Sequence, residues 1–196
     1  MTGYHYANYT FKYPKLTCVA KNPQDQCGFF GCNFMAVSDI NLFGFEKVTF
    51  DRQMCYFRSE VKIVIENCKI VEFKYMDFCE GKPSLRITGA DRININMIFG
   101  TRNMVFQTQT CDSLDIWDSS LSFDTSKINV KQLFLMGSQI GFAKLDLTGV
   151  SKKLSIASTN VFDVESMVLG QGINLYIDSC YGAREKLEPV IRYQGR

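Results

Sequence analysis

The segment LFLMGSQIGF, residues 133–142, decides the fold because three other segments nearly repeat it. The copies begin at Leu114 (LDIWDSSLSF), Leu154 (LSIASTNVFD) and Leu175 (LYIDSCYGAR), so successive intervals are 19, 21 and 21 residues. Self-similarity at about 20 residues is typical of a solenoid, in which each turn buries its apolar edge against its neighbours. Within each copy, apolar residues alternate with others as in a short strand. We therefore predict an all-β, parallel β-solenoid.

The same pattern extends upstream, to IVIENCKIVEF from Ile63 and LRITGADRI from Leu85. The interval from Leu85 to Leu114 is 29 residues, so we expect either one longer turn or an irregular turn near Met104. The first turn is expected at residues 48–50, and the turns as a whole at about 19 to 24 residues. The alternative is a β-sandwich, but the regular interval and the scarcity of hairpin dipeptides argue against it.

A small residue stands at the fifth step of each repeat, where we expect an inward-facing bend. The hydroxyl groups of Ser and Thr at such a bend can hydrogen-bond backbone groups that the bend leaves unpaired. The series consists of Cys68, Ala90, Ser119, Ser138, Thr159 and Cys180. The segments between the repeats are too short for a full helix with two loops, and are expected to return the chain as extended or one-turn segments. They contribute a second apolar row, at Ile128, Val130, Leu145, Leu147, Met167 and Leu169.

Charge and hydropathy exclude two classes of partner. The 196 residues include 22 basic and 20 acidic side chains, which are scattered along the chain and give a formal net charge of +2. Nucleic-acid and anionic-membrane surfaces need clustered Lys and Arg, so neither partner is expected. No apolar stretch approaches the roughly 18 residues of a membrane-spanning helix.

The cysteines indicate an oxidising compartment. Their number, eight, is even, their spacing is not that of a zinc site, and His5 is the one histidine. A disulfide framework in a secreted protein is therefore expected, with the export signal already removed. The tripeptide Asn8-Tyr9-Thr10 is a glycosylation acceptor and agrees with secretion.

The repeat pattern L-x-I/L-x-x-S/C/T-x-I/L-x-F is similar to the leucine-rich repeat. At the N-terminus, LTCVAKNPQDQCGFFGCNF places eight residues between Cys18 and Cys27, and FGFEKVTF follows. This run resembles the N-terminal cap of secreted leucine-rich-repeat proteins of mosquitoes, which act in haemolymph immunity or in saliva. The resemblance implies a Cys18–Cys27 disulfide and protein–protein recognition in insect innate immunity or as a salivary host-interaction factor.

Three regions follow from this interpretation. Residues 1–44 form an N-terminal segment and disulfide cap, and residues 45–182 form a leucine-rich-repeat-like solenoid. Residues 183–196 form a C-terminal tail, with a further domain downstream as one alternative. In that alternative, the chain is a structural N-terminal domain that positions the part after it.

Catalytic motifs are absent, since GxGxxG, GxxxxGK[ST], HExxH and GxSxG do not occur. We expect no enzyme, cofactor or metal. The alternative is a carbohydrate-active solenoid enzyme that uses Asp115, Asp118 and Asp124. A working carboxylate pair needs a separation of about 5 to 9.5 Å. The ladder equivalents of Asp115 are Phe134 and Ser155, so no acid lies beside it.

The candidate binding site lies on the outward side of the repeated strands. Residues between the core positions of a strand face away from the core. In the later repeats they form an apolar stripe in which Asp115 and Asp178 are the acidic members, and Trp117, Phe134, Met136 and Tyr176 the large apolar ones. Such side chains are typical of interface centres. We expect another protein, of a host or a second copy of this chain, to bind here; the alternative is that a loop or a further domain covers the stripe.

Overall fold

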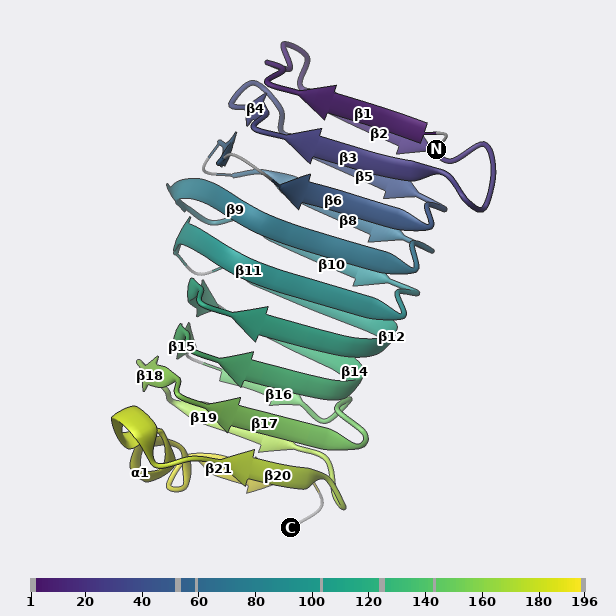
Figure 1. Cartoon of the computed structure of the whole chain (residues 1–196). Helices are drawn as coiled ribbons and strands as arrows, with labels where there is room; N and C mark the ends of the chain where they lie inside the picture. The colour runs from purple at the N-terminus through teal and green to yellow at the C-terminus, as the bar shows by residue number, and fades with distance from the viewer. Residues whose placement is uncertain are drawn as a thin grey trace.

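The computed structural model describes residues 3–51, 54–58, 60–102, 104–123, 126–142 and 144–194. The chain is an all-β parallel solenoid of about nine turns, with about 21 residues in each turn (Figure 1). Every strand pairs in parallel with the equivalent strand of the next turn, so backbone hydrogen bonds run along the solenoid axis. The predicted all-β parallel β-solenoid and its turn length are confirmed.

Two rows of longer strands lie on opposite sides of the core, and we call them the front and back sheets. The front sheet consists of β1 (Gly3–Ala7), β3 (Gln26–Phe30), β6 (Lys47–Asp51), β9 (Ile70–Gly81), β11 (Arg92–Thr101), β12 (Val105–Trp117), β14 (Ser126–Met136), β17 (Lys153–Ala157) and β20 (Asn174–Ile177). The back sheet consists of β2 (Lys15–Val19), β5 (Asp39–Phe43), β8 (Lys62–Glu66), β10 (Ser84–Thr88), the first parts of β12 and β14, β16 (Lys144–Leu147), β19 (Ser166–Leu169) and β21 (Ile191–Tyr193).

A narrow third side closes each turn between the two sheets. It is built by β4 (Asn33–Phe34), β7 (Cys55–Phe57), the ends of β9 and β11, β13 (Ser120–Phe123), β15 (Gln139–Phe142) and β18 (Asn160–Phe162). A short 3₁₀ turn at Cys180–Gly182 and the single-turn helix α1 (Ala183–Leu187) pack beside β18 at the C-terminal end (Figure 1).

The register confirms the repeat that opened the sequence. Leu114, Leu133, Leu154 and Leu175 pair directly, each with the next, in β12, β14, β17 and β20. The first three are fully buried, and Leu175 in the last turn is partly exposed. The predicted return segments are the back sheet, and all six residues of the second apolar row are buried there or at its bend.

The upstream repeats belong to the other sheet, which explains the interval of 29 residues. Ile63 and Leu85 pair with each other in the back sheet, in β8 and β10, and Leu85 pairs with Phe106 in β12. The front-sheet partner of Leu114 is Ile93. The interval therefore combines one turn with a step from the back sheet to the front, so the prediction of a longer turn is wrong. The irregularity near Met104 is a register shift between Thr108 and Cys111.

The solenoid also begins earlier and ends later than we predicted. Residues 48–50 lie in β6, which is the third turn, because β1 and β3 stack above it in register. The segment 1–44, predicted as a cap, thus supplies β1 to β5 of the solenoid. Within the predicted tail, β21 pairs with β19 and belongs to the last turn.

Aromatic columns fill the N-terminal half of the core. Phe11, Phe34, Phe57 and Phe78 follow one another with ring centroids 4.9, 4.7 and 5.0 Å apart. Tyr6, Phe29, Phe50 and Phe73 form a second column, with spacings of 5.4, 4.8 and 5.3 Å. Such spacings suit aromatic pairs and match the distance between turns. In the column that continues from Phe73, the later turns carry Ile95, Ile116, Leu135 and Ile156 in place of the rings.

The bends explain the small residues at the fifth step. A residue with φ between 45° and 60° follows the front strand, for example at Asp118 and Gly137, and turns the next side chain inward. Ser119, Ser138 and Thr159 are buried there, and each hydroxyl donates to the carbonyl two residues earlier, at 2.7 to 2.9 Å. Cys68 and Ala90 occupy the equivalent bend after the back strand. Cys180 departs from the series, because it is exposed in the 3₁₀ turn.

The structure forms no disulfide: all eight cysteines, including Cys18 and Cys27 of the predicted cap, are free. Cys18 and Cys27 point into the core from opposite sheets and are joined by a hydrogen bond rather than a covalent bond. This hydrogen bond lowers the pKa of the Cys18 thiol and raises the pKa of the Cys27 thiol, to which burial adds. Cys79 and Cys180 are exposed, and the other six cysteines are buried.

Candidate binding face

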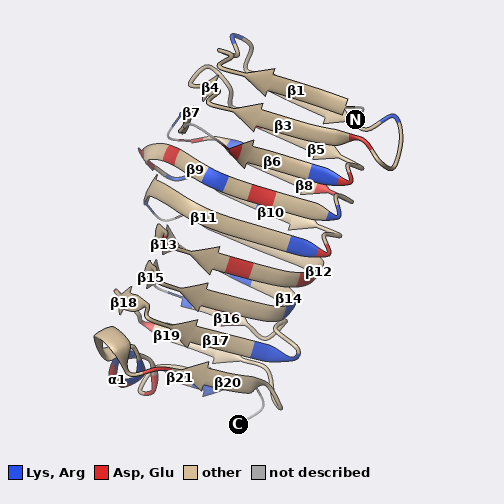
Figure 2. Cartoon of the chain, in the orientation of Figure 1, with Lys and Arg blue, Asp and Glu red and all other residues tan. Residues whose placement is uncertain are grey.

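The outward side of the front sheet divides into a charged half and an apolar half. One outward row runs through His5, Gly28, Thr49, Glu72, Asn94, Asp115, Phe134, Ser155 and Tyr176. The next runs through Asp51, Lys74, Asn96, Trp117, Met136 and Ala157. Figure 2 shows charged positions on β6 and β9, whereas the front of β14, β17 and β20 carries few.

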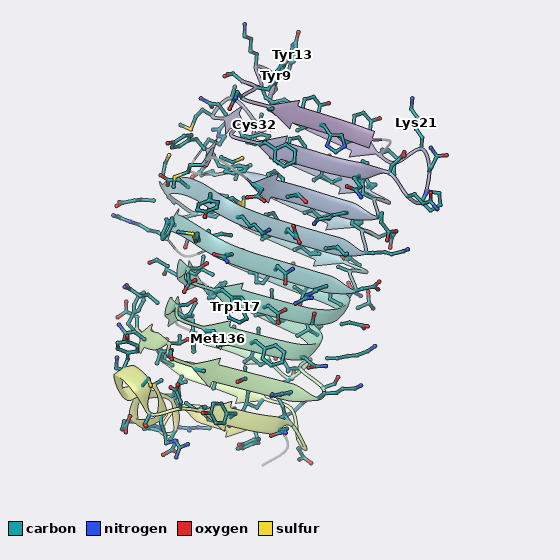
Figure 3. The ribbon with its side chains drawn as sticks, viewed as in Figure 1. Tyr9, Tyr13, Lys21, Cys32, Trp117 and Met136 are labelled. Atoms are coloured by element: carbon teal, nitrogen blue, oxygen red, sulfur yellow. The ribbon has the colours of Figure 1, made fainter. Side chains whose placement is uncertain are left out.

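The predicted stripe is brought together on the apolar half. We call Trp117, Phe134, Met136 and Tyr176 the aromatic patch. Trp117 and Met136 are directly paired in adjacent turns, and Figure 3 shows them one above the other on the front face. Tyr176 lies two turns below Phe134, with Ser155 between them. Trp117 is 41% exposed and Tyr176 is 52% exposed, while Phe134 and Met136 are half-buried.

A cation covers one edge of the patch. The Lys153 ammonium lies 5.0 Å from the centroid of the Phe134 ring, which is the geometry of a cation–π contact. Lys153 is on β17, one turn below Phe134. The contact orients the ring and leaves Trp117 and Tyr176 as the most exposed members of the patch.

The two acids predicted for the site have structural contacts instead of free carboxylates. Asp115 is 7% exposed, and its Oδ2 accepts a hydrogen bond from Arg92 Nη2 at 3.3 Å. Asp178 accepts the backbone N–H groups of Ser158, at 2.7 Å, and Cys180, at 3.1 Å. Asp115 therefore borders the patch as half of an ion pair, and Asp178 stabilises the bend of the last turn.

The charged half, which sequence reasoning missed, holds a small ion network. Lys47 Nζ lies 2.9 Å from Glu72 Oε2, and Lys74 Nζ lies 3.5 Å from Glu72 and 3.6 Å from Asp51. Burial alone would raise the pKa of Glu72, but the hydrogen bond and charge of Lys47, together with Lys74, lower it overall. These residues are about one turn apart in sequence, a spacing that could have revealed the network once the front-sheet register was known.

The acids proposed for catalysis do not form a pair. Asp115 has Asn94 and Phe134 as its neighbours in register, so it has no acid beside it in its row. Asp118 is exposed at a bend with φ of 45°, and Asp124 lies outside the described residues. Across the described ranges, no group of three His, Cys, Asp or Glu side chains could hold a metal ion. No helix in that part of the chain is long and apolar enough to cross a membrane.

The fold and this face define a parallel β-solenoid that presents an exposed aromatic patch on one sheet. No family model, curated protein or solved structure matches the chain.

Proposed function

We propose that the chain is a non-catalytic binding module that recognises another protein through the aromatic patch. The observation that carries the proposal is the exposure of Trp117 and Tyr176 on a regular sheet, beside the half-buried Phe134 and Met136. Contiguous apolar surface of this kind commonly marks an interaction site. Aromatic and Met side chains are also the residues that interface centres favour.

The surroundings of the patch suit a protein partner. The Arg92–Asp115 ion pair borders it on one side and Lys153 on another, so charged groups surround an apolar centre. This is the usual arrangement of a protein–protein interface, in which buried anchors contribute most of the binding free energy. The partner is another protein, of a host or a second copy of this chain.

The setting is proposed from the sequence resemblance. The likeness to leucine-rich repeats supports a role in insect innate immunity or as a salivary factor. It also supports the proposal that the solenoid is of leucine-rich-repeat type. Asn8 of the glycosylation acceptor is exposed directly after β1, so a glycan could be attached without disturbing the core. Expression in insect cells, with Asn8→Gln as control, tests this proposal: glycosylated, exported wild type supports secretion, and unmodified intracellular protein contradicts it.

The binding proposal is tested by a double substitution, Trp117→Ser with Phe134→Ser. Capture of proteins from haemolymph, saliva and host serum, and self-association by sedimentation, are measured for the variant and for wild type. The matched control is Tyr13→Ser with Tyr56→Ser, because these rings are 79% and 46% exposed outside the patch. Loss of partner binding in the first variant alone supports the proposal, since truncation of interface anchors often costs about 2 kcal/mol or more. Equal binding by all three proteins contradicts it.

A carbohydrate-active enzyme is the second candidate, and the ion network favours it. Lys74 contacts both Asp51 and Glu72, which places two carboxylates on neighbouring turns within reach of one substrate. The lowered pKa of Glu72 suits a charged base or nucleophile rather than a general acid. Release of reducing ends from polysaccharides by wild type, abolished by Glu72→Gln, would support this activity. No release by wild type across neutral and acidic polymers would exclude it for those substrates.

A further inference from the structure

The back sheet carries a polar hollow at a β-bulge between β12 and β14. The register shifts there, because β12 holds Gln109 and Thr110 where β14 holds Asn129 alone. The register shift shortens the step between paired residues from 20, between Thr108 and Ile128, to 19, between Cys111 and Val130. Bulges often lie beside binding sites, because they redirect side chains and interrupt the regular ladder.

The hollow has a volume of about 310 Å³ and is open to solvent. Its lining includes Arg86, Thr88, Gln107, Gln109, Lys127 and Asn129. Two of these side chains are cations and none is an acid. The hollow is therefore both positive and rich in hydrogen-bonding groups.

The two cations lie in one outward row on either side of Gln107. Arg86 pairs in register with Gln107, and Gln107 pairs with Lys127 in the next turn. Because adjacent strands are about 4.8 Å apart, the two backbone positions are about 10 Å apart. Arg86 forms no ion pair with any residue that the structure describes. Lys127 has only a distant partner, Asp146 Oδ2 at 3.8 Å, in an exposed pair of small energetic value.

The neutral groups of the hollow also have unused hydrogen-bonding capacity. Within the described ranges, the side-chain amides of Gln107, Gln109 and Asn129 form no hydrogen bond. The hydroxyl oxygen of Thr88 is buried and has no partner there, which is unusual because buried polar groups are nearly always paired. Asn129 lies against the backbone of Gly149, where a Cβ would collide with its Oδ1. The amide is thus held in place by packing.

We propose that this hollow binds an acidic saccharide unit, whose carboxylate or sulfate group is held by Arg86 and Lys127. Charge-assisted hydrogen bonds to oxyanions are the strongest that these side chains make. The ring hydroxyls both donate and accept hydrogen bonds, so they match the three side-chain amides. The hollow lies on the back sheet, so the proposal is independent of the aromatic patch on the front.

Isothermal titration of the whole chain at low salt tests the proposal. The probes are a galacturonic acid trisaccharide, a heparin-derived tetrasaccharide, maltotriose and sodium sulfate. We expect at least one acidic oligosaccharide to bind about tenfold more tightly than both maltotriose and sulfate. Its binding should weaken as added salt screens the charges. Tighter binding of the galacturonic acid trisaccharide would identify carboxylate as the preferred group, and tighter binding of the heparin tetrasaccharide, which carries carboxylates as well, would show that sulfate groups add to the affinity. Binding of maltotriose or sulfate as tight as that of both acidic probes would overturn the proposal.

Two variants and a control locate the binding. Arg86→Gln with Lys127→Gln should lower the affinity for the acidic oligosaccharide at least about tenfold. Lys12→Gln with Lys152→Gln removes the same charge at exposed positions outside the hollow and should leave the affinity unchanged. Gln107→Leu removes the amide that lies between the two cations and should weaken binding several-fold without lowering Tm. Equal loss in the control pair, or unchanged affinity in both hollow variants, would overturn the assignment.

Discussion

At the scale of single residues, the fold depends on small hydroxyl groups that link one turn to the next. Ser138 Oγ donates to the Met136 carbonyl in its own turn and accepts the backbone N–H of Ser119 from the previous turn. Ser119 Oγ accepts the N–H of Ile98 in the same way. Inward bends therefore need a short side chain, and at the bends after the front strands Ser and Thr also donate a hydrogen bond to the backbone.

Replacing Ser138 by Ala should lower the free energy of unfolding by about 1 to 3 kcal/mol, because it leaves a buried N–H without its acceptor. Ser138→Thr keeps the hydroxyl and should be milder, since Thr159 occupies this position one turn later. Chemical denaturation measures both changes. The control is Ser151→Ala, at an exposed position, which should change stability by less than about 0.5 kcal/mol. Equal effects at 138 and 151 would contradict the proposed role of the bend hydroxyl.

Glu72 gives the front sheet a defined pH response. Lys47 and Lys74 lower the pKa of its carboxyl in the folded chain, so the ion network stabilises the fold above the unfolded pKa of about 4.3. That contribution is lost as the pH falls through the lower folded value. Tm measured between pH 7 and pH 2 should therefore fall less steeply in acid for Glu72→Gln than for wild type. Superimposable profiles would show that Glu72 does not contribute.

At the scale of elements, four successive bends after the back strands hold a left-handed residue. Gly44, Asn67, Gly89 and Thr110 fill this position in successive turns, with φ of 76°, 55°, 70° and 53°. A β-branched residue is the least suited to this conformation. We expect Thr110→Gly to raise the free energy of unfolding by up to about 1 kcal/mol, because relief of strain exceeds the added freedom of the unfolded chain.

Thr49→Gly is the control for that substitution. Thr49 lies in the middle of β6 with an extended backbone, so glycine there should cost about 0.5 to 1 kcal/mol. Denaturant midpoints of the two variants should move in opposite directions from wild type. Destabilisation by both would mean that the bend does not strain Thr110.

How far the sequence predicts these elements depends on how their residues repeat. Leu114, Leu133, Leu154 and Leu175 share one sheet and one register, so their spacing gave the fold class and the outward face. Ile63 and Leu85 share the same alternation but belong to the back sheet, and periodicity alone does not distinguish two parallel sheets. The ion pair of Asp115 and the bulge opposite Asn129 were not predictable, because both depend on which residues become neighbours across turns.

At the scale of the whole molecule, the solenoid is a stack in which each turn contacts only its neighbours. The stability of such a stack is close to a sum of turn and interface terms, so opening should start at the ends. The six buried cysteines can be used to follow the order in which the turns open, because they are spread from Cys18 in the first turn to Cys111 near the middle. Burial raises the pKa of the Cys55 thiol to about 11, which keeps the folded state unreactive there.

Thiol labelling as a function of denaturant should therefore reveal an order. Without denaturant, only the exposed Cys79 and Cys180 should react at pH 8, and all eight should react after full unfolding. At intermediate denaturant, Cys18 and Cys27 should be labelled before Cys111, because fewer turns cover them on the N-terminal side. Peptide mass spectrometry identifies the labelled sites. Simultaneous labelling of all six buried thiols would contradict opening from the ends. It would mean that all turns unfold as one cooperative unit, with the aromatic columns joining the N-terminal turns to the others.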